Sequence, residues 1–386
     1  MTPMIPKTNR VGSRRIRIKW AGICALAVAV LAVAGTQAQA DPKDLGPLPK
    51  VKKQNPAAVE LGKLLFFDNR ISGDADIKCS QCHIPEKGWA DGKELSTGYP
   101  STEYFRNAKT VMNAVHATYF YWDGRLDGAD MPTQVRDIIT ESHFHAADGR
   151  IMAQRLKNIP EYVDLFKKAF GSEPSFGTIL KSVSAFERTL VSKNVPFDKF
   201  ITGDKGAISA KAKQGLELFK GKAGCIQCHS GPYFSDSEAH NLGVPENARI
   251  FLEAKRHITF RSMLSFLGVP NYHNLRRDPG FFAITKDYKD MGKFVTPTLR
   301  EVSRTGPYMH NGVIKTLAGV VDFYNGGGGK DPLKDKRIKP LGLSGAEKSA
   351  LVAFLESLSG DPIIIKITKK DLPKYKAIPN WYKVAN

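Results

Sequence analysis

Two short segments of this sequence have the pattern C-x-x-C-H, the first over residues 79–83 and the second over residues 225–229. Two thiols three positions apart on a tight turn can each form a thioether to one vinyl group of a haem, and the histidine that follows can bind the iron. The alternatives are a thioredoxin-type redox pair and half of a zinc site. A redox pair does not need the histidine, and the segments lie too far apart for a compact zinc ribbon. The pattern therefore predicts two covalently bound haems, attached through Cys79, Cys82, His83, Cys225, Cys228 and His229.

The elements that must position these residues are predicted to be mostly helical. Each C-x-x-C-H segment follows a G-x-x-L-F segment, 62–66 in one case and 215–219 in the other, which indicates a duplicated cytochrome c-like unit. Strand patterns are scarce, so we predict a mostly α fold with two cytochrome c-like haem domains and long loops. A glycine run at 326–329 predicts a flexible break. Further helices are expected at 151–158, 161–170, 176–192, 317–324 and 344–359, the last opening on a capping box.

The first forty residues have the composition of a secretory signal. A basic stretch precedes an apolar stretch over 21–35, and a small-residue cleavage site follows at 38–40. An uncleaved N-terminal anchor is the alternative, although the apolar stretch is short for a membrane span. We therefore expect a periplasmic protein with a signal peptide over 1–40. The Gly/Asp/Lys composition at 203–206 indicates a boundary between a first haem domain over 41–205 and a second haem domain over 206–386.

The charge balance is strongly basic, with 57 lysines and arginines against 38 aspartates and glutamates. Such an excess favours anionic partners, for example an acidic redox protein or a membrane face. A solvated basic surface is the simpler alternative, and nucleic acid is not expected as the partner of an exported protein.

Four further motifs accompany the two C-x-x-C-H segments: Arg106-Asn107-Ala108, Trp122-Asp123-Gly124-Arg125, Thr296-Pro297-Thr298-Leu299-Arg300 and Gly306-Pro307-Tyr308-Met309-His310-Asn311-Gly312. Together they resemble the bacterial di-haem cytochrome c peroxidase and MauG family, and the resemblance covers nearly the whole mature chain. It implies a peroxide site at the first haem, an electron-transfer role for the second, and a calcium ion between the domains.

The same resemblance assigns roles to residues between the haems. It implies that Asn107, Thr305 and Pro307 bind the calcium ion, the last two through backbone carbonyls, which suit a hard cation. Trp122 matches a tryptophan between the haems that could pass electrons, although buried aromatic packing is an alternative. His310 is expected to bond a haem propionate rather than iron.

The sixth ligand of the second iron is expected to be a tyrosine. The family's peroxidases place a methionine fourteen residues after the histidine of the P-Y-x-H segment, and counting from His310 leads to Tyr324. This resembles the MauG variant, in which a tyrosine is the distal ligand. Met309 and Met291 are competing donors, and Tyr324 could instead be a packed helix residue.

The first haem is expected to have a side open to peroxide. The family's peroxidases usually carry a displaceable histidine sixteen residues after the attachment histidine, and here that position is Tyr99. The resemblance therefore implies that no such ligand blocks the first haem in the oxidised resting state. His116 is the remaining candidate ligand, although it is more easily interpreted as a packed helix residue.

Peroxide cleavage also needs a group that moves a proton between the two oxygens. The family uses a glutamine, matched here by Gln134, and a glutamate ten residues later, where this sequence has Phe144. Glu141 is our candidate for the displaced glutamate. His143 and His145 are alternatives, and Glu141 could also be a solvated loop residue without a catalytic role.

Together these expectations describe a di-haem oxidoreductase that uses hydrogen peroxide, with electrons passing through the second haem. The donor would be a small cytochrome c or cupredoxin. A homodimer of this chain is one expected oligomeric state. The alternative is MauG-type oxidation of residues in a partner protein to mature a protein-derived cofactor, which Tyr99 and Tyr324 favour. A plain electron carrier would need six ligands at both irons.

The stretch between 241 and 292 is longer than the family pattern, and we expect a loop there that could contact a partner.

Overall fold

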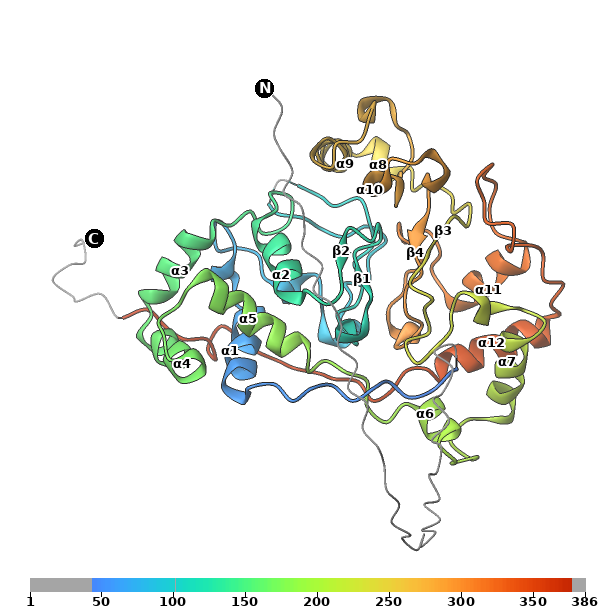
Figure 1. Cartoon of the computed structure of the whole chain (residues 1–386), viewed down its shortest axis with the longest axis horizontal. Helices are drawn as coiled ribbons and strands as arrows, with labels where there is room; N and C mark the ends of the chain where they lie inside the picture. Colours follow the sequence, from blue (N-terminus) through green and yellow to red (C-terminus); the bar gives the residue numbers. More distant parts are fainter. Residues whose placement is uncertain (1–43, 101, 377–386) are drawn as a thin grey trace, which may run out of the picture. The chain divides into compact units, whose positions relative to one another are not determined.

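Helices supply most of the regular structure of the chain (Figure 1). The computed structural model describes residues 44–100 and 102–376, so the expected signal peptide and its cleavage site lie outside the described residues. Within those ranges, no helix is both long enough and apolar enough to span a bilayer. The α-helices are α1 (Pro56–Phe66), α2 (Met131–Thr140), α3 (Gly149–Lys157), α4 (Pro160–Phe170), α5 (Phe176–Glu187), α6 (Pro196–Ile201), α7 (Ala210–Lys220), α8 (Arg249–Leu252), α9 (Ala254–Phe266), α10 (Phe282–Thr285), α11 (Leu317–Asn325) and α12 (Gly345–Glu356).

Sheet is limited to two short antiparallel ribbons in the part of the chain that the structure describes. One pairs β1 (Tyr119–Phe120) with β2 (Leu126–Asp127), and the other pairs β3 (Ala239–His240) with β4 (Phe294–Val295). The prediction of a mostly α fold with long loops is confirmed.

The first hydrophobic core lies among α1 to α5. Helix α1 packs so closely on α5 that a Cβ atom at Gly62 would lie 1.9 Å from the backbone oxygen of Ser182. The same arrangement recurs in the second core, among α6, α7, α11 and α12, where a Cβ at Gly215 would lie 2.0 Å from the backbone oxygen of Ala350. The repeated G-x-x-L-F segment thus marks the same close helix contact in both halves, because only glycine lets the backbones approach so far.

A third core joins the 241–292 stretch to the first half of the chain. This stretch, called the extension below, is not one long loop, because it contains α8, α9 and α10. Each fully buried side chain of this size contributes roughly 1.5–3 kcal/mol, so the cluster fixes the extension firmly. Its buried members are Ile250, Phe260, Met263, Leu264, Val269, Phe282, Ala283 and Met291 from the extension, with Leu95, Tyr104 and Phe105 from the first half.

The two ends of the described chain cross over to opposite cores (Figure 1). Near the start, Leu45 packs against the second core, and the backbone carbonyl of Gly46 accepts a hydrogen bond from Arg300 (2.6 Å). Near the end, Ile363, Ile365 and Ile367 pack against the first core. Each core is therefore completed by a segment from the far end of the chain.

The predicted helices are confirmed, although their ends differ from those expected. The capping box of α12 forms between Ser344 and Glu347. The helix expected over 176–192 ends at Glu187, because the backbone of the following residues bonds instead to Asn113, whose side chain accepts from the N–H of Ser192 (2.8 Å).

The glycine run at 326–329 is not a flexible break. The N–H of Gly329 donates to the carbonyl of Leu242 (3.0 Å), and a Cβ atom at Gly329 would lie 1.7 Å from the oxygen of Gly243. Two backbones cross here at close range, so these glycines serve packing rather than mobility.

Candidate functional site

Each C-x-x-C-H segment folds as a single tight turn. In the first, the N–H groups of Cys82 and His83 both donate to the carbonyl of Cys79, at 3.2 and 3.0 Å. In the second, the carbonyl of Cys225 accepts from the next cysteine and histidine at 3.3 and 2.9 Å. All four thiols are free in the described chain. Both turns therefore gather two thiols and one imidazole, as attachment of a haem c requires.

The two attachment histidines have the same second hydrogen bond. His83 donates through Nδ1 to the carbonyl of Trp89 (3.1 Å), and His229 donates through Nδ1 to the carbonyl of Phe234 (3.0 Å). This bond fixes the ring and leaves Nε2 as the nitrogen available to a metal. Burial lowers the pKa of both histidines, which favours the neutral form that binds metal.

Sequence reasoning missed these two carbonyl partners. Trp89 and Phe234 both have positive φ angles, 61° and 55°, and this conformation turns the chain back toward the imidazole. The signal that could have revealed them is an aromatic residue six positions after His83 and five after His229.

A cavity of about 260 Å³ opens above the second turn. Its walls hold all three attachment residues of that turn and most of the residues predicted to act with the second haem. The predicted site residues in its lining are Cys225, Cys228, His229, Tyr324, His310, Trp122, Asn107, Thr305 and Pro307.

His310 contributes an unpaired nitrogen to this cavity. Its ring is 4% exposed and stacks on Phe294 with centroids 3.6 Å apart, and its Nε2 has no hydrogen-bond partner among the described residues. Burial lowers the pKa of His310 to about 3. A neutral imidazole with an orphaned nitrogen in a cavity wall suits a polar group of a bound ligand, such as a haem propionate.

Tyr324 lies in the same cavity, on α11, close enough to Cys225 and Cys228 for the charges of these groups to interact. Burial raises the pKa of its phenol. Of the two competing donors, Met309 also lines the cavity. Met291 belongs to the buried cluster of the extension and is not part of the lining. The residues of this cavity fit a haem c, which Cys225, Cys228 and His229 would hold, with the Tyr324 phenol in the same lining.

The predicted calcium ligands and Trp122 are also brought together. Trp122 donates through Nε1 to the carbonyl of Asn107 (2.9 Å), and the Asn107 amide donates to the carbonyl of Lys93 (2.8 Å). The Lys109 ammonium lies 5.2 Å from the centre of the Trp122 ring. Trp122 thus packs against the segment that follows Arg106 and lines the cavity at the second turn.

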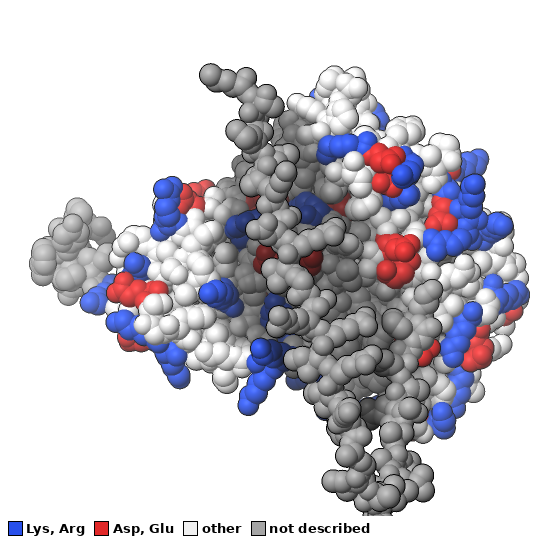
Figure 2. Space-filling model, in the orientation of Figure 1, with Lys and Arg blue, Asp and Glu red and all other residues white. Residues whose placement is uncertain are grey.

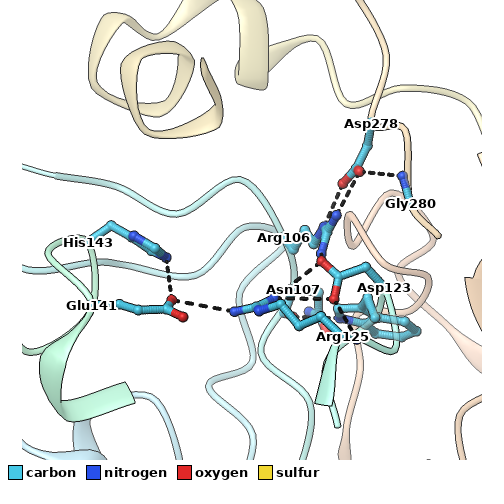
Figure 3. A network of polar contacts seen from close by, with 9 residues as sticks. Arg106, Asn107, Asp123, Arg125, Glu141, His143, Asp278 and Gly280 are labelled. Atoms are coloured by element: carbon cyan, nitrogen blue, oxygen red, sulfur yellow. Dashed lines mark hydrogen bonds and ion pairs between the residues drawn. The ribbon is translucent and has the colours of Figure 1, made fainter. Parts of the chain in front are cut away.

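The candidate acid–base residue, Glu141, is held in a charged cluster at the end of α2 (Figure 3). Its Oε2 lies 3.1 Å from Nε2 of His143 and 3.4 Å from a guanidinium nitrogen of Arg125. All three side chains are largely buried. Glu141 is therefore not a solvated loop carboxylate, because it is enclosed between an imidazole and a cation.

This cluster is connected to the first attachment turn by the segment that contains Tyr99. Cys82 Sγ lies 3.7 Å from the Thr97 hydroxyl, and the N–H of Tyr99 donates to the carbonyl of His143 (3.1 Å). The phenol of Tyr121, beside Arg125, is buried without a hydrogen-bond partner among the described residues. An orphaned hydroxyl beside the Arg125–Glu141 pair fits a site that is completed by a bound group, and sequence reasoning did not identify Tyr121.

Three other residues predicted to act at the first haem lie near this cluster. Gln134 is half-buried on α2, two turns before Glu141. His145 is buried with Nδ1 3.4 Å from the carbonyl of Ile71, and burial lowers its pKa to about 4. The Tyr99 hydroxyl is bonded to Asp74.

His116 also has an unpaired nitrogen, Nε2, among the described residues. It ends a short 3-10 helix over Ala114–His116 and is half-buried, so the expectation of a packed helix residue is only partly met.

A chain of buried ion pairs leads from Arg125 into the second half of the molecule (Figure 3). Asp123 lies 3.2 Å from Arg125 and 2.6 Å from Arg106, and Arg106 also pairs with Asp278 (2.6 Å). Burial alone would raise the pKa of Asp123, but Arg125 and Arg106 lower it to about 2. These carboxylates are thus charged and fully hydrogen-bonded, although Arg106, Asp123 and Asp278 are almost completely buried.

Comparisons with known proteins identify the family to which this chain is similar. Residues 56–206 match the family model described as di-haem cytochrome c peroxidase. The chain is 50% identical over 345 residues to "Cytochrome-c peroxidase IdrP2" of Denitromonas iodatirespirans, covering 89% of this chain and 92% of that protein. It is 36% identical over 323 residues to "Methylamine utilization protein MauG" of Methylorubrum extorquens, covering 83% of each.

A solved structure, of a MauG-like protein associated with microbial copper homeostasis, superposes with a TM-score of 0.68 at 27% identity, over 84% of this chain and 95% of that one. The two C-x-x-C-H turns, the helical fold and the extent of these matches lead to one conclusion: the chain belongs to the family of di-haem cytochrome c peroxidases and MauG proteins, whose members carry two c-type haems.

Proposed function

We propose that this protein is a periplasmic di-haem oxidoreductase that reduces hydrogen peroxide to water with electrons from an external donor. The observation that carries the proposal is the difference between the surroundings of the two turns. The first is linked to a buried carboxylate–imidazole pair, and the second faces a cavity with a phenol. Bound haem would supply a peroxide-accepting iron at the first site and an electron-storing iron at the second.

The proposed attachment follows the two turns. Cys79 and Cys82 would hold the first haem with His83 as iron ligand, in a peroxidatic half over 41–205. Cys225, Cys228 and His229 would do the same in an electron-transfer half over 206–386. The matching Nδ1 hydrogen bonds of the two histidines support this assignment, because each leaves Nε2 free for the metal.

Reduction of hydrogen peroxide consumes two electrons and two protons and yields two waters. As the O–O bond breaks, a proton must move from one oxygen to the other. We assign this transfer to Glu141, with His143 holding the carboxylate in place and Arg125 stabilising its charge. Gln134, two turns earlier on α2, would orient the peroxide.

The second half would receive and pass on electrons. His229 and Tyr324 would bind the second iron, and a phenolate ligand favours its oxidised state more than a thioether does. His310 would bond a propionate through its unpaired nitrogen. Trp122 is the proposed path between the haems, and Asn107, Thr305 and Pro307 are the proposed calcium ligands along the same cavity.

Tyr324→Phe is expected to change the absorbance and EPR spectra of the second haem in the oxidised holoprotein, because the oxygen ligand is lost. Tyr308→Phe is the matched control, since it removes another phenol from the same cavity wall. Its hydroxyl is bonded to the carbonyl of Val302 (3.0 Å), so the control spectra should stay as in the unchanged protein. Unaltered spectra in Tyr324→Phe would remove this residue as a ligand and direct attention to Met309.

The donor is proposed to be a small acidic redox protein, such as a cytochrome c or cupredoxin. On the face shown in Figure 2, basic side chains are spread among acidic ones rather than gathered in one patch. Charge alone therefore does not select a docking site. The extension exposes Leu252, Ile258 and Phe266 near the basic residues Lys255 and Lys286, which suits a partner that is acidic and partly apolar.

The proposed activity is tested by adding hydrogen peroxide to the holoprotein with a reduced small cytochrome c. We expect two molecules of the cytochrome to be oxidised for each peroxide consumed, with no such turnover in a Cys79→Ala/Cys82→Ala variant. Stopped-flow absorbance with the fully oxidised holoprotein then tests the resting state. A fast change in the haem bands means that the first site is open at rest, and a reaction only after partial reduction contradicts that expectation.

A second candidate is MauG-type oxidation of a partner protein. Two observations favour it: Tyr324 lies in the cavity of the second turn, and Tyr99 stands where the family's peroxidases usually have a histidine. In this case the oxidised protein would react with peroxide quickly but would oxidise the reduced cytochrome slowly. The ratio of these two rates separates the alternatives.

A further inference from the structure

Arg256, on α9, is a buried cation that ties the extension to the first half of the chain. Its side chain is 5% exposed. Its Nε lies 2.6 Å from Glu253, one turn earlier, and its Nη2 lies 2.8 Å from Glu103. Nη1 donates to two backbone carbonyls, those of Ser96 (2.9 Å) and Tyr104. One guanidinium thus bonds one carboxylate of the extension and, in the first half of the chain, one carboxylate and two carbonyls.

The two carbonyls stand at the base of a hairpin. Residues 96–100 and 102–104 form this element, named here the Tyr99 hairpin. Thr97 and Glu103 pair across it as an antiparallel bridge, and the N–H of Tyr104 donates to the carbonyl of Ser96 (3.1 Å). The guanidinium therefore closes the hairpin at its open end, where both strands leave for the rest of the chain.

The Tyr99 hairpin in turn holds His143. The ring of Tyr104 stacks on the His143 ring, with centroids 5.5 Å apart and planes 4° from parallel. The carbonyl of His143 accepts from the N–H of Tyr99 (3.1 Å) and from the hydroxyl of Thr102 (3.5 Å). Both the ring and the backbone of His143 are fixed by the hairpin, and His143 contacts Glu141 at 3.1 Å.

We infer that Arg256 is a positioning residue for the Glu141–His143 pair, an inference that rests on the proposed function. The order of contacts is Arg256 to the Tyr99 hairpin, the hairpin to His143, and His143 to Glu141. A proton-transfer group works only within a narrow geometry, and a displacement of about 1 Å can cost roughly 10²-fold in rate. The extension is thus part of the support of the peroxide site as well as a surface that could contact a partner.

The test compares Arg256→Met, Arg256→Lys and Arg249→Met in the holoprotein. Arg249 is the matched control, because it also pairs with Glu253 (2.5 Å) but is half-exposed. Its other ion pair is with Glu94, which lies outside the hairpin. We expect Arg256→Met to lower the rate constant for reaction with hydrogen peroxide about 10- to 100-fold. Arg256→Lys should keep part of the rate, and Arg249→Met should keep all of it.

A double-mutant cycle separates positioning from general damage. If Arg256 acts through Glu141, then Arg256→Met should cost little in a Glu141→Gln background, so the two losses would not add. Additive losses, or an unchanged rate in Arg256→Met, would overturn the inference. Spectra of the second haem should stay the same in every Arg256 variant, and a change there would also count against a local role.

Hydrogen exchange gives a readout that does not depend on activity. The amides of Tyr99 and Tyr104 should exchange faster in Arg256→Met than in Arg249→Met, because the base of the hairpin is released. Faster exchange without a loss of rate would mean that Arg256 holds the hairpin but does not position the pair. If Glu141→Gln alone keeps the full rate while the exchange result holds, the assigned role of Glu141 fails rather than the contact made by Arg256.

Discussion

Replacing Glu141 by glutamine is expected to lower the rate constant for reaction with hydrogen peroxide by roughly 10²–10⁴. Glutamine keeps the size and hydrogen-bonding capacity of the side chain but cannot take up and return a proton. The surrounding pairs should also weaken, because Arg125 and His143 lose a charged partner. Stopped-flow absorbance of the oxidised holoprotein measures the effect directly.

Asp137→Asn is the matched control for this experiment. Asp137 is a half-buried carboxylate on the same helix, α2, and it pairs with the exposed Arg136 at 2.7 Å. Its loss should leave the peroxide rate unchanged. A Glu141→Gln protein that reacts as fast as the unchanged protein would exclude Glu141 as the proton carrier, and His143→Gln would be the next variant to measure.

Replacing Arg106 by methionine is expected to reduce the free energy of unfolding by about 3–5 kcal/mol. Arg106 is 1% exposed and is paired with Asp123 and Asp278, both 0% exposed. Removing the cation leaves Asp278 charged and buried without its main partner, whereas Asp123 keeps Arg125 at 3.2 Å. Denaturant unfolding followed by circular dichroism measures the loss.

The size of this effect should depend on pH. The folded pKa of Asp123 is about 2 and that of Asp278 is lowered, both below the ordinary value near 3.9. Their contribution to stability is therefore present above about pH 4 and is lost as the pH falls through the folded values. Without Arg106 the pKa values of both carboxyls rise, so the difference between the two proteins should shrink below about pH 4.

Two further variants make the stability prediction specific. Arg106→Met/Asp278→Asn should recover part of the loss, because the second change removes the stranded charge. Arg150→Met breaks an ion pair with Asp148 that is highly exposed, and it should have little measurable effect. A double variant no more stable than Arg106→Met would contradict the explanation based on an uncompensated buried charge.

Local patterns in the sequence predicted a large part of the structure. The spacing of the two C-x-x-C-H segments is a property of one turn each, and the turns form as expected. The periodic helices also appear, because their apolar faces can be read within one element. The count from His310 leads to Tyr324, a residue on α11 that lines the cavity, and its role as an iron ligand stays a prediction.

Contacts between distant residues could not be predicted in the same way. Arg106 and Asp278 are 172 positions apart, and nothing in either local sequence indicates the partner. The extension was expected to be a surface loop, but its buried residues contact a segment about 150 positions earlier, and only the folded chain shows this. The glycines at 326–329 were misinterpreted for a related reason: glycine serves both flexible links and close backbone crossings, and sequence alone does not distinguish them.

The crossing of the two end segments has a consequence for how the molecule is assembled. Trp89, which supplies the carbonyl partner of His83, donates its own Nε1 to the carbonyl of Ile363 (2.9 Å), 274 positions later. The surroundings of Trp89, and through Trp89 those of His83, are therefore completed by a residue close to the end of the described chain. Neither half is therefore an independent folding unit. A fragment that ends between α6 and α7 would lack the Ile363 carbonyl that Trp89 bonds, and the other fragment would lack Leu45.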